Sequence, residues 1–341
     1  MRRIMLKLGH SPVLGRLIRQ DEPVEELGIS TYKRVDEALV AGDGEQACRL
    51  VRYMVEEYIT IYRFMIEWID DLSSFLGERG DPVAFERTHE LARRRTLEPR
   101  REFLARSSPD LVDAWMGHLD RLRTRTEDPR SLAQGAASTF ESAARLGAPD
   151  APGLLEKIWL EYLIPHDFVV AWAHELVASI AAACGEEGVP EALSRTWELR
   201  WKARYRKWHQ MTPVERLQLS VEGMRGHLSG KSRRGDILVW EEPLRYVISL
   251  DPCGSGGMLR TGDLVSGIGP YPGGGVNRAP HEWTWNRTGI PWYSTHCPIV
   301  MEMLSQRDWG FPMRPVEFPE ERDGPCCWFI YKDPVHGLRA A

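Results

Sequence analysis

The residues that interrupt regular structure are concentrated in the last third of this 341-residue chain. Residues 229–341 hold 15 of the 30 Gly, 12 of the 23 Pro and six of the 13 Trp. Gly and Pro end helices and strands, so a shift of this size separates a helical part from a loop-rich part. The sequence therefore predicts a helical domain over residues 1–228 and an α+β domain over residues 229–341.

The first part carries apolar residues at the three- and four-residue spacing that is typical of amphipathic helices. The strongest segment, Glu45 to Leu76, is predicted to bury an aromatic stripe and to end at Gly77. Its outward positions are predicted to carry Glu56, Glu57, Arg63 and Asp70. Further helices are predicted over 110–125, 153–184 and 189–209 and from Thr212 onward, with a kink or break at Pro165.

The last third changes to short β-rich runs. The runs 237–240 and 244–250 predict a hairpin, and the runs 313–318 and 327–331 predict two more strands around a polar turn. A helix is predicted near residues 294–306. An antiparallel sheet with at least one helix on it makes an α+β domain.

Composition excludes several classes of protein. The chain is 43% hydrophobic and 27% charged, which is an ordinary globular mixture. A net charge of −5 argues against a general nucleic-acid-binding protein. The chain shows neither a secretory signal nor an uninterrupted apolar run long enough for a membrane span. We therefore expect a cytoplasmic protein that meets a small molecule rather than nucleic acid or membrane, with homo-oligomer formation left open.

Four of the six cysteines lie in the last third, where the backbone is predicted to turn. Cys253 follows a strand, Cys297 begins a helix, and Cys326 and Cys327 begin the last strand. Thiolates bind Zn²⁺ or iron–sulfur clusters, so these cysteines are candidate metal ligands, with His296 as a further ligand. Neighbouring strand residues point to opposite faces, so only one of Cys326 and Cys327 is expected at the site. The alternative is that all four are small buried side chains.

Cys297 has a second interpretation as a nucleophile. A helix N-terminus stabilises a thiolate, and His296 is the adjacent residue. Nearby Trp and Tyr residues are able to line a small-molecule pocket, and His281 and Glu282 precede this aromatic stretch as candidate acid–base groups beside His296.

The segments Tyr293–Leu304 and Gly324–Lys332 resemble the end of the L-2-amino-thiazoline-4-carboxylate hydrolase-like family. There a Cys begins a helix and a later Cys begins a final strand with alternating aromatic residues. The same segments also resemble, more faintly, the four-vinyl-reductase-type small-molecule domain, in which Cys residues hold zinc beside an aromatic pocket. The resemblance makes Cys297 and one of Cys326 and Cys327 the matching positions, with Cys253 in place of a Cys that residues 314–323 lack.

Three functions follow from these interpretations. The first is a metal-dependent enzyme, with zinc the expected metal, that acts as a hydrolase or lyase on a small organic substrate. The second is a small-molecule-binding or sensor protein with structural zinc. The third is an iron–sulfur redox protein.

Overall fold

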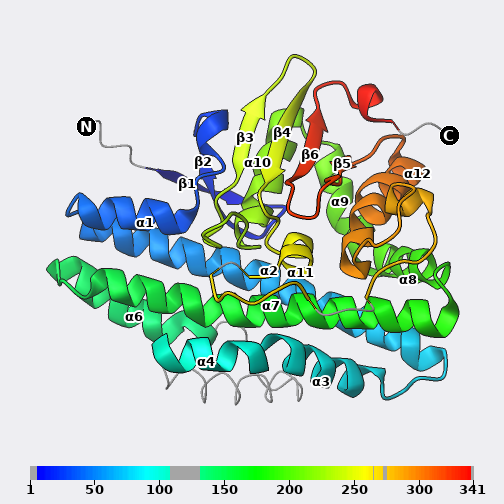
Figure 1. The fold of residues 1–341 in the computed structure, drawn as a ribbon. Coiled ribbons are helices and arrows are strands. Elements are labelled where there is room, and N and C mark those ends of the chain that lie inside the picture. Colours follow the sequence, from blue (N-terminus) through cyan, green and yellow to red (C-terminus); the bar gives the residue numbers. More distant parts are fainter. Residues whose placement is uncertain (1–5, 108–130, 264, 272–274, 339–341) are drawn as a thin grey trace.

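The computed structural model describes residues 6–107, 131–263, 265–271 and 275–338. Long helices form one layer, and a four-stranded antiparallel sheet stands on one side of it (Figure 1). The predicted α+β class, with a helical N-terminal region and a C-terminal antiparallel sheet, is confirmed. The predicted helix over residues 110–125 lies outside the described residues.

The bounds of the elements are as follows. The helices are α1 (Thr31–Val40), α2 (Gly44–Glu78), α3 (Ala84–Thr96), α4 (Glu98–Ser107), α6 (Ser131–Leu146), α7 (Ala151–Cys184), α8 (Gly188–Thr196), α9 (Lys202–His209), α10 (Pro213–Arg225), α11 (Gly256–Thr261) and α12 (Ser305–Trp309). Two π-helical segments are Trp197–Trp201 and Cys297–Leu304. The strands are β1 (Lys7–Ser11), β2 (Arg16–Gln20), β3 (Leu238–Glu241), β4 (Arg245–Leu250), β5 (Val316–Glu317) and β6 (Cys326–Tyr331).

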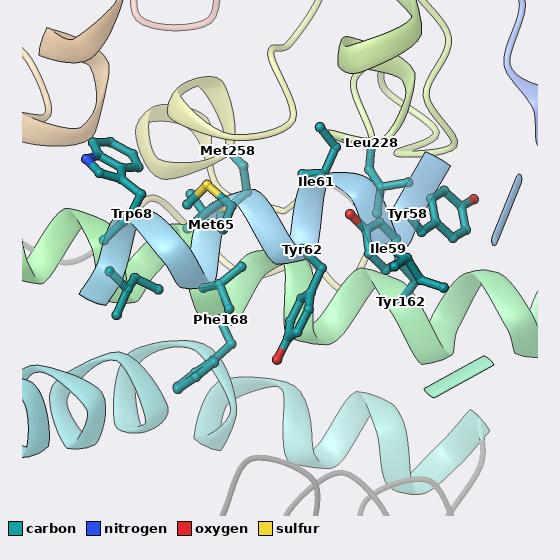
Figure 2. Close-up of a cluster of buried hydrophobic side chains, with 14 of the residues drawn as sticks. Tyr58, Ile59, Ile61, Tyr62, Met65, Trp68, Tyr162, Phe168, Leu228 and Met258 are labelled. Carbon is teal, nitrogen blue, oxygen red and sulfur yellow. The ribbon is translucent and has the colours of Figure 1, made fainter. Parts of the chain in front are cut away.

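Helix α2 is the predicted long amphipathic helix. It begins after Asp43, whose carboxylate accepts a hydrogen bond from the backbone N–H of Gln46 at 3.2 Å, as an N-cap does. Its aromatic stripe is buried against α7, and the rings of Tyr58 and Tyr162 stack with their centroids 4.0 Å apart. Figure 2 shows this contact within the cluster formed by Tyr58, Ile59, Ile61, Tyr62, Met65, Trp68, Tyr162, Phe168, Leu228 and Met258.

Helix α7 runs without interruption through Pro165, so a break there is wrong, and the alternative, a kink, stays a prediction. Proline removes one backbone donor, but residues 165–177 are buried, α7 packs against α2, α3 and α6, and this packing holds the helix together. Among the described helices, α7 is the one long and apolar enough to cross a membrane. Two thirds of the most apolar 18-residue stretch of α7 is buried inside the protein, as in a core helix.

Two features of the first part differ from the prediction. The chain begins with a hairpin, β1–β2, ahead of the helices. Glu57 does not face outward: it is 1% exposed, and its carboxylate pairs with Arg225 of α10 at 2.8 Å. Arg225 also pairs with Glu222, which lies 3.3 Å from Arg16 of β2. This buried ion network joins the hairpin, α2 and α10.

The four-stranded sheet has the order β3-β4-β6-β5, with every neighbouring pair antiparallel. The predicted hairpin and last strand are present, but the predicted strand over residues 313–318 is reduced to β5. In β6 the side chains of Cys326 and Trp328 point to the buried face, where they pack in one cluster with Leu217 and Val221 of α10. Helix α10 begins at the predicted capping box of Thr212 and Glu215.

Packing crosses the composition boundary near residue 228. Leu217 and Val221 of α10 belong to the core of the sheet, while Met258 and Trp292 belong to the core of the long helices. The boundary therefore marks a change in secondary structure, and the interface between the two parts is where a site with walls from both can form.

Candidate functional site

A cavity of about 70 Å³ lies between α2, α10 and the sheet. That is room for about five to seven water molecules, so it suits a small ligand. The aromatic part of its wall includes Trp68, Tyr205, Trp208, Trp285, Tyr293 and Trp328. The polar part consists of Arg204, His227, Cys253, Ser255, Ser294, His296, Cys297, Arg314 and Cys326. Convergent polar groups in an apolar hollow are the usual composition of a small-molecule site.

Close backbone packing brings two of these segments together. A Cβ atom on Gly254 would lie 1.6 Å from the carbonyl oxygen of His227, so only glycine fits at this position. The backbone N–H of Gly254 also donates to the hydroxyl of Ser229 at 3.2 Å. The turn that carries Cys253 is thereby held against the end of α10, which carries His227.

His296 and Cys297 form a thiol–imidazole pair at the cavity wall. Nδ1 of His296 lies 2.6 Å from the carbonyl oxygen of Tyr293, and a carbonyl only accepts, so Nδ1 carries the hydrogen. The other nitrogen, Nε2, therefore has a free lone pair, and it lies 3.6 Å from Sγ of Cys297. The thiol is the donor in this contact. This is the geometry in which a base takes the proton of a nucleophile.

The thiol of Cys297 is protonated at rest. Burial raises its pKa well above the ordinary value, and the positive charge of Arg314 opposes this effect. Burial lowers the pKa of His296 to about 4, so its ring is neutral at pH 7. The predicted thiolate at a free helix N-terminus is not what the structure shows, because the π-helical segment at Cys297 continues directly from a 3-10 turn, Trp292–Thr295. The pair needs proton transfer to become reactive.

Arg314 brings a positive charge to the same wall. Its side chain is only 8% exposed, Nε of its guanidinium group is buried without a hydrogen-bond partner, and no acidic side chain of the described residues forms an ion pair with the group. The group lies over the ring of Trp328, with Cζ 3.9 Å from the centroid. Burial lowers the pKa of Arg314, which is the mark of a charge without a counter-ion. Sequence analysis missed Arg314, since 37 of the 44 basic residues are Arg.

Cys253, Cys297 and Cys326 line the same cavity. Sγ of Cys253 lies 3.3 Å from the hydroxyl of Ser255, and burial raises the pKa of Cys326 to about 12. Within the described residues, however, no three side chains of His, Cys, Asp or Glu are arranged so that they could hold a metal ion. The metal centre therefore stays a prediction.

Three predicted site residues lie away from this cavity. Cys327 is on the opposite face of β6 from Cys326, as expected for neighbouring strand residues. His281 lies 2.7 Å from Glu186, which follows α7, and stacks on Trp283, which fixes a loop. Glu282 is exposed at the start of a 3-10 turn. Sequence analysis also missed His227, which follows α10 and shows no recognisable motif.

The chain was compared with protein-family models, curated proteins and solved structures, and none of these comparisons gives a match. The resemblance to the thiazoline-carboxylate hydrolase-like family therefore stays a prediction, and the site has to be interpreted from its own chemistry.

Proposed function

We propose that this protein is an enzyme of the hydrolase type that acts on a small organic anion, with Cys297 as nucleophile, His296 as its base and Arg314 as the group that binds the anion. The observation that carries the proposal is the unpaired guanidinium group of Arg314 in the same cavity wall as the Cys297–His296 pair. Arg314 would bind the negative charge of a small ligand, and Cys297 and His296 would react with the same ligand.

The burial of Arg314 carries a cost in free energy. A buried ion without a partner loses its hydration and gains little in return, at a cost of several kcal/mol. Stacking on Trp328 returns about 2 kcal/mol of this cost. A bound carboxylate or similar anion supplies the missing partner, and Arg is well suited to it because its planar fork matches two oxygens. The cavity is therefore prepared for a negatively charged ligand.

The thiol of Cys297 is the group that would react with such a ligand. When an anionic substrate places an electrophilic C=O or C=N carbon beside Sγ, the proton of Cys297 passes to Nε2 of His296 as the S–C bond forms. The protonated ring then returns this proton to the leaving group as it departs. Water hydrolyses the resulting thioester or its imino equivalent, which regenerates the thiol. Protons balance, and the steps need neither an oxidant nor a reductant.

Alkylation with two small reagents tests the proposal. Iodoacetate carries a carboxylate and iodoacetamide does not, so the ratio of their rates at one cysteine reports the local charge. Cys184, which is partly exposed on α7, serves as the internal reference. We expect the iodoacetate-to-iodoacetamide ratio at Cys297 to exceed that at Cys184 by about tenfold, the effect of 1.4 kcal/mol. Arg314→Gln should abolish this difference.

Equal ratios at the two cysteines, or an unmodified Cys297, overturn the proposal. The second candidate is a zinc enzyme with Cys253, Cys297 and Cys326 as ligands: the three thiols line one cavity, although their present arrangement is not that of a metal site. Metal analysis of the purified protein separates the two. One zinc ion per chain, with Cys297 protected from iodoacetamide until a chelator is added, would replace the thiol mechanism by a metal-dependent one.

A further inference from the structure

We propose that His227 is a second proton-transfer group of this cavity, which activates the water that hydrolyses the Cys297 thioester, and that His166 and Asp167 position it. This inference rests on the proposed function. It is carried by a chain of three buried side chains that ends at the cavity wall.

The chain starts at a carboxylate. Oδ1 of Asp167 lies 2.9 Å from Nδ1 of His166, and Nε2 of His166 lies 3.2 Å from Nδ1 of His227. Asp167 and His166 are adjacent residues of α7, whereas His227 follows α10. All three side chains are at least nine-tenths buried.

The direction of these hydrogen bonds follows from the carboxylate. An ionised Asp only accepts, so Nδ1 of His166 carries a hydrogen and its Nε2 carries a lone pair. Nδ1 of His227 must then donate to that lone pair. This leaves Nε2 of His227 as an acceptor, and His227 lines the cavity. Among the described residues, the one side-chain hydrogen bond of His227 is the contact of its Nδ1 with His166, so Nε2 keeps its lone pair for a molecule in the cavity.

A second set of charges holds Asp167 ionised. Arg233 pairs with it at 2.6 Å and Arg100 pairs with it from α4, and these charges lower the pKa of Asp167 despite its burial. Asp263 pairs with both arginines, at 3.3 and 3.0 Å. Two carboxylates and two guanidinium groups balance one another. Asp167, the end of the hydrogen-bonded chain that lies furthest from the cavity, is therefore fixed in both charge and position.

The two histidines of the cavity have separate tasks. Nε2 of His296 faces Sγ of Cys297, whereas His227 enters from the end of α10. In the hydrolytic step, water gives a proton to Nε2 of His227 while its oxygen bonds to the thioester carbon. The hydrogen bond from Nδ1 to His166 strengthens as the ring becomes positive. The C–S bond then breaks, the sulfur of Cys297 takes the proton from Nε2 of His227, and the carboxylic acid product leaves.

Acetyl phosphate, a small anion with a reactive acyl group, tests this step. Mass spectrometry follows the acetyl adduct on Cys297 as it forms and disappears. In His227→Gln the adduct should form at the wild-type rate but disappear more slowly by about 10²- to 10⁴-fold, the usual contribution of a general base. His209→Gln is the matched control, because His209 is a half-buried histidine on α9 outside the cavity wall. Its adduct should behave as in the wild type.

Nitrogen-15 NMR of the histidines in the unmodified protein gives a test that needs neither a variant nor a substrate. We expect both His166 and His227 to carry their ring N–H hydrogen on Nδ1. A hydrogen on Nε2 of His227, or an adduct lifetime unchanged by His227→Gln, overturns the inference while Cys297 remains a nucleophile. Failure of both acetylation and alkylation of Cys297 overturns the proposed function instead. His166→Asn should lengthen the adduct lifetime less than His227→Gln and shift the His227 tautomer.

Discussion

The carbonyl oxygen of Tyr293 lies 2.6 Å from Nδ1 of His296, and this contact decides which nitrogen of the ring faces Cys297. Because the carbonyl holds the hydrogen on Nδ1, the lone pair of Nε2 is always presented to the thiol. The adjacent position of the two residues in the sequence does not by itself bring them into contact; the turn at residues 292–295 does so.

His296→Gln should slow the alkylation of Cys297 at pH 7. Burial keeps the thiol protonated, so its reaction needs the base, and removal of a general base typically costs about 10²-fold or more. Peptide mapping after timed exposure to iodoacetamide measures the rate. His336→Gln, at an exposed position, is the control. An unchanged rate in His296→Gln would show that the thiol reacts without its neighbour.

Arg314→Met should not destabilise the protein and is expected to raise its free energy of unfolding by about 1 kcal/mol. The substitution removes an unpaired buried charge and keeps apolar bulk against Trp328. Denaturant titration measures the change. Acetate should raise the melting temperature of the wild type, since a ligand stabilises the state that binds it, but should not raise that of the variant. A clear loss of stability would mean that Arg314 has a structural partner.

Local sequence patterns predicted those parts of the fold that depend on near neighbours. The spacing of aromatic residues in α2 and the capping box of α10 involve residues within one or two turns, and both are present. The break offered as one outcome at Pro165 is absent because packing on three sides of α7 keeps the helix continuous. Glu57 was misplaced for a similar reason: its partner Arg225 lies 168 residues further along the chain.

The candidate site was predicted only in part. Cys253, Cys297 and Cys326 stood out as a rare residue type at predicted turns, and they do line one cavity. His227 and Arg314 carried no such signal. The contact of His227 with His166 spans 61 residues, and Arg314 is one of many arginines. A contact between residues far apart in the sequence cannot be recognised from a single sequence when neither residue belongs to a motif.

Arg225→Met should destabilise the protein strongly, in contrast to Arg314→Met. It leaves the carboxylates of Glu57 and Glu222 buried without their main partner, and breaking a buried pair in this way costs about 3–5 kcal/mol. Arg195→Met, which breaks an exposed pair with Glu78, should cost at most about 1 kcal/mol. Urea unfolding of the three variants gives the comparison. Equal losses for Arg225→Met and Arg195→Met would contradict the importance of the buried network.

Acidification should destabilise the protein before its carboxylates titrate. Burial is the first cause of a lowered pKa in five histidines: His166, His174, His209, His227 and His296. The unfolded chain takes up protons at these rings as the pH falls through about 6.5, whereas the folded protein does not. Their contribution to stability is therefore complete above pH 6.5 and is lost as the pH falls towards about 4. The lowered pKa values of Asp167 and Glu222 add a further loss only below about pH 4.

His174→Gln tests this prediction on a single ring. The pKa of His174 is about 3, so the wild type should lose about 1.4 kcal/mol per pH unit through this residue between pH 6 and pH 4. Urea titrations at several pH values should give a shallower dependence for His174→Gln, by about that slope, even if the variant is less stable at pH 7. His336→Gln should keep the wild-type slope because this ring is exposed in both states. If His174→Gln retained the full slope, His174 would have to be protonated inside the folded protein.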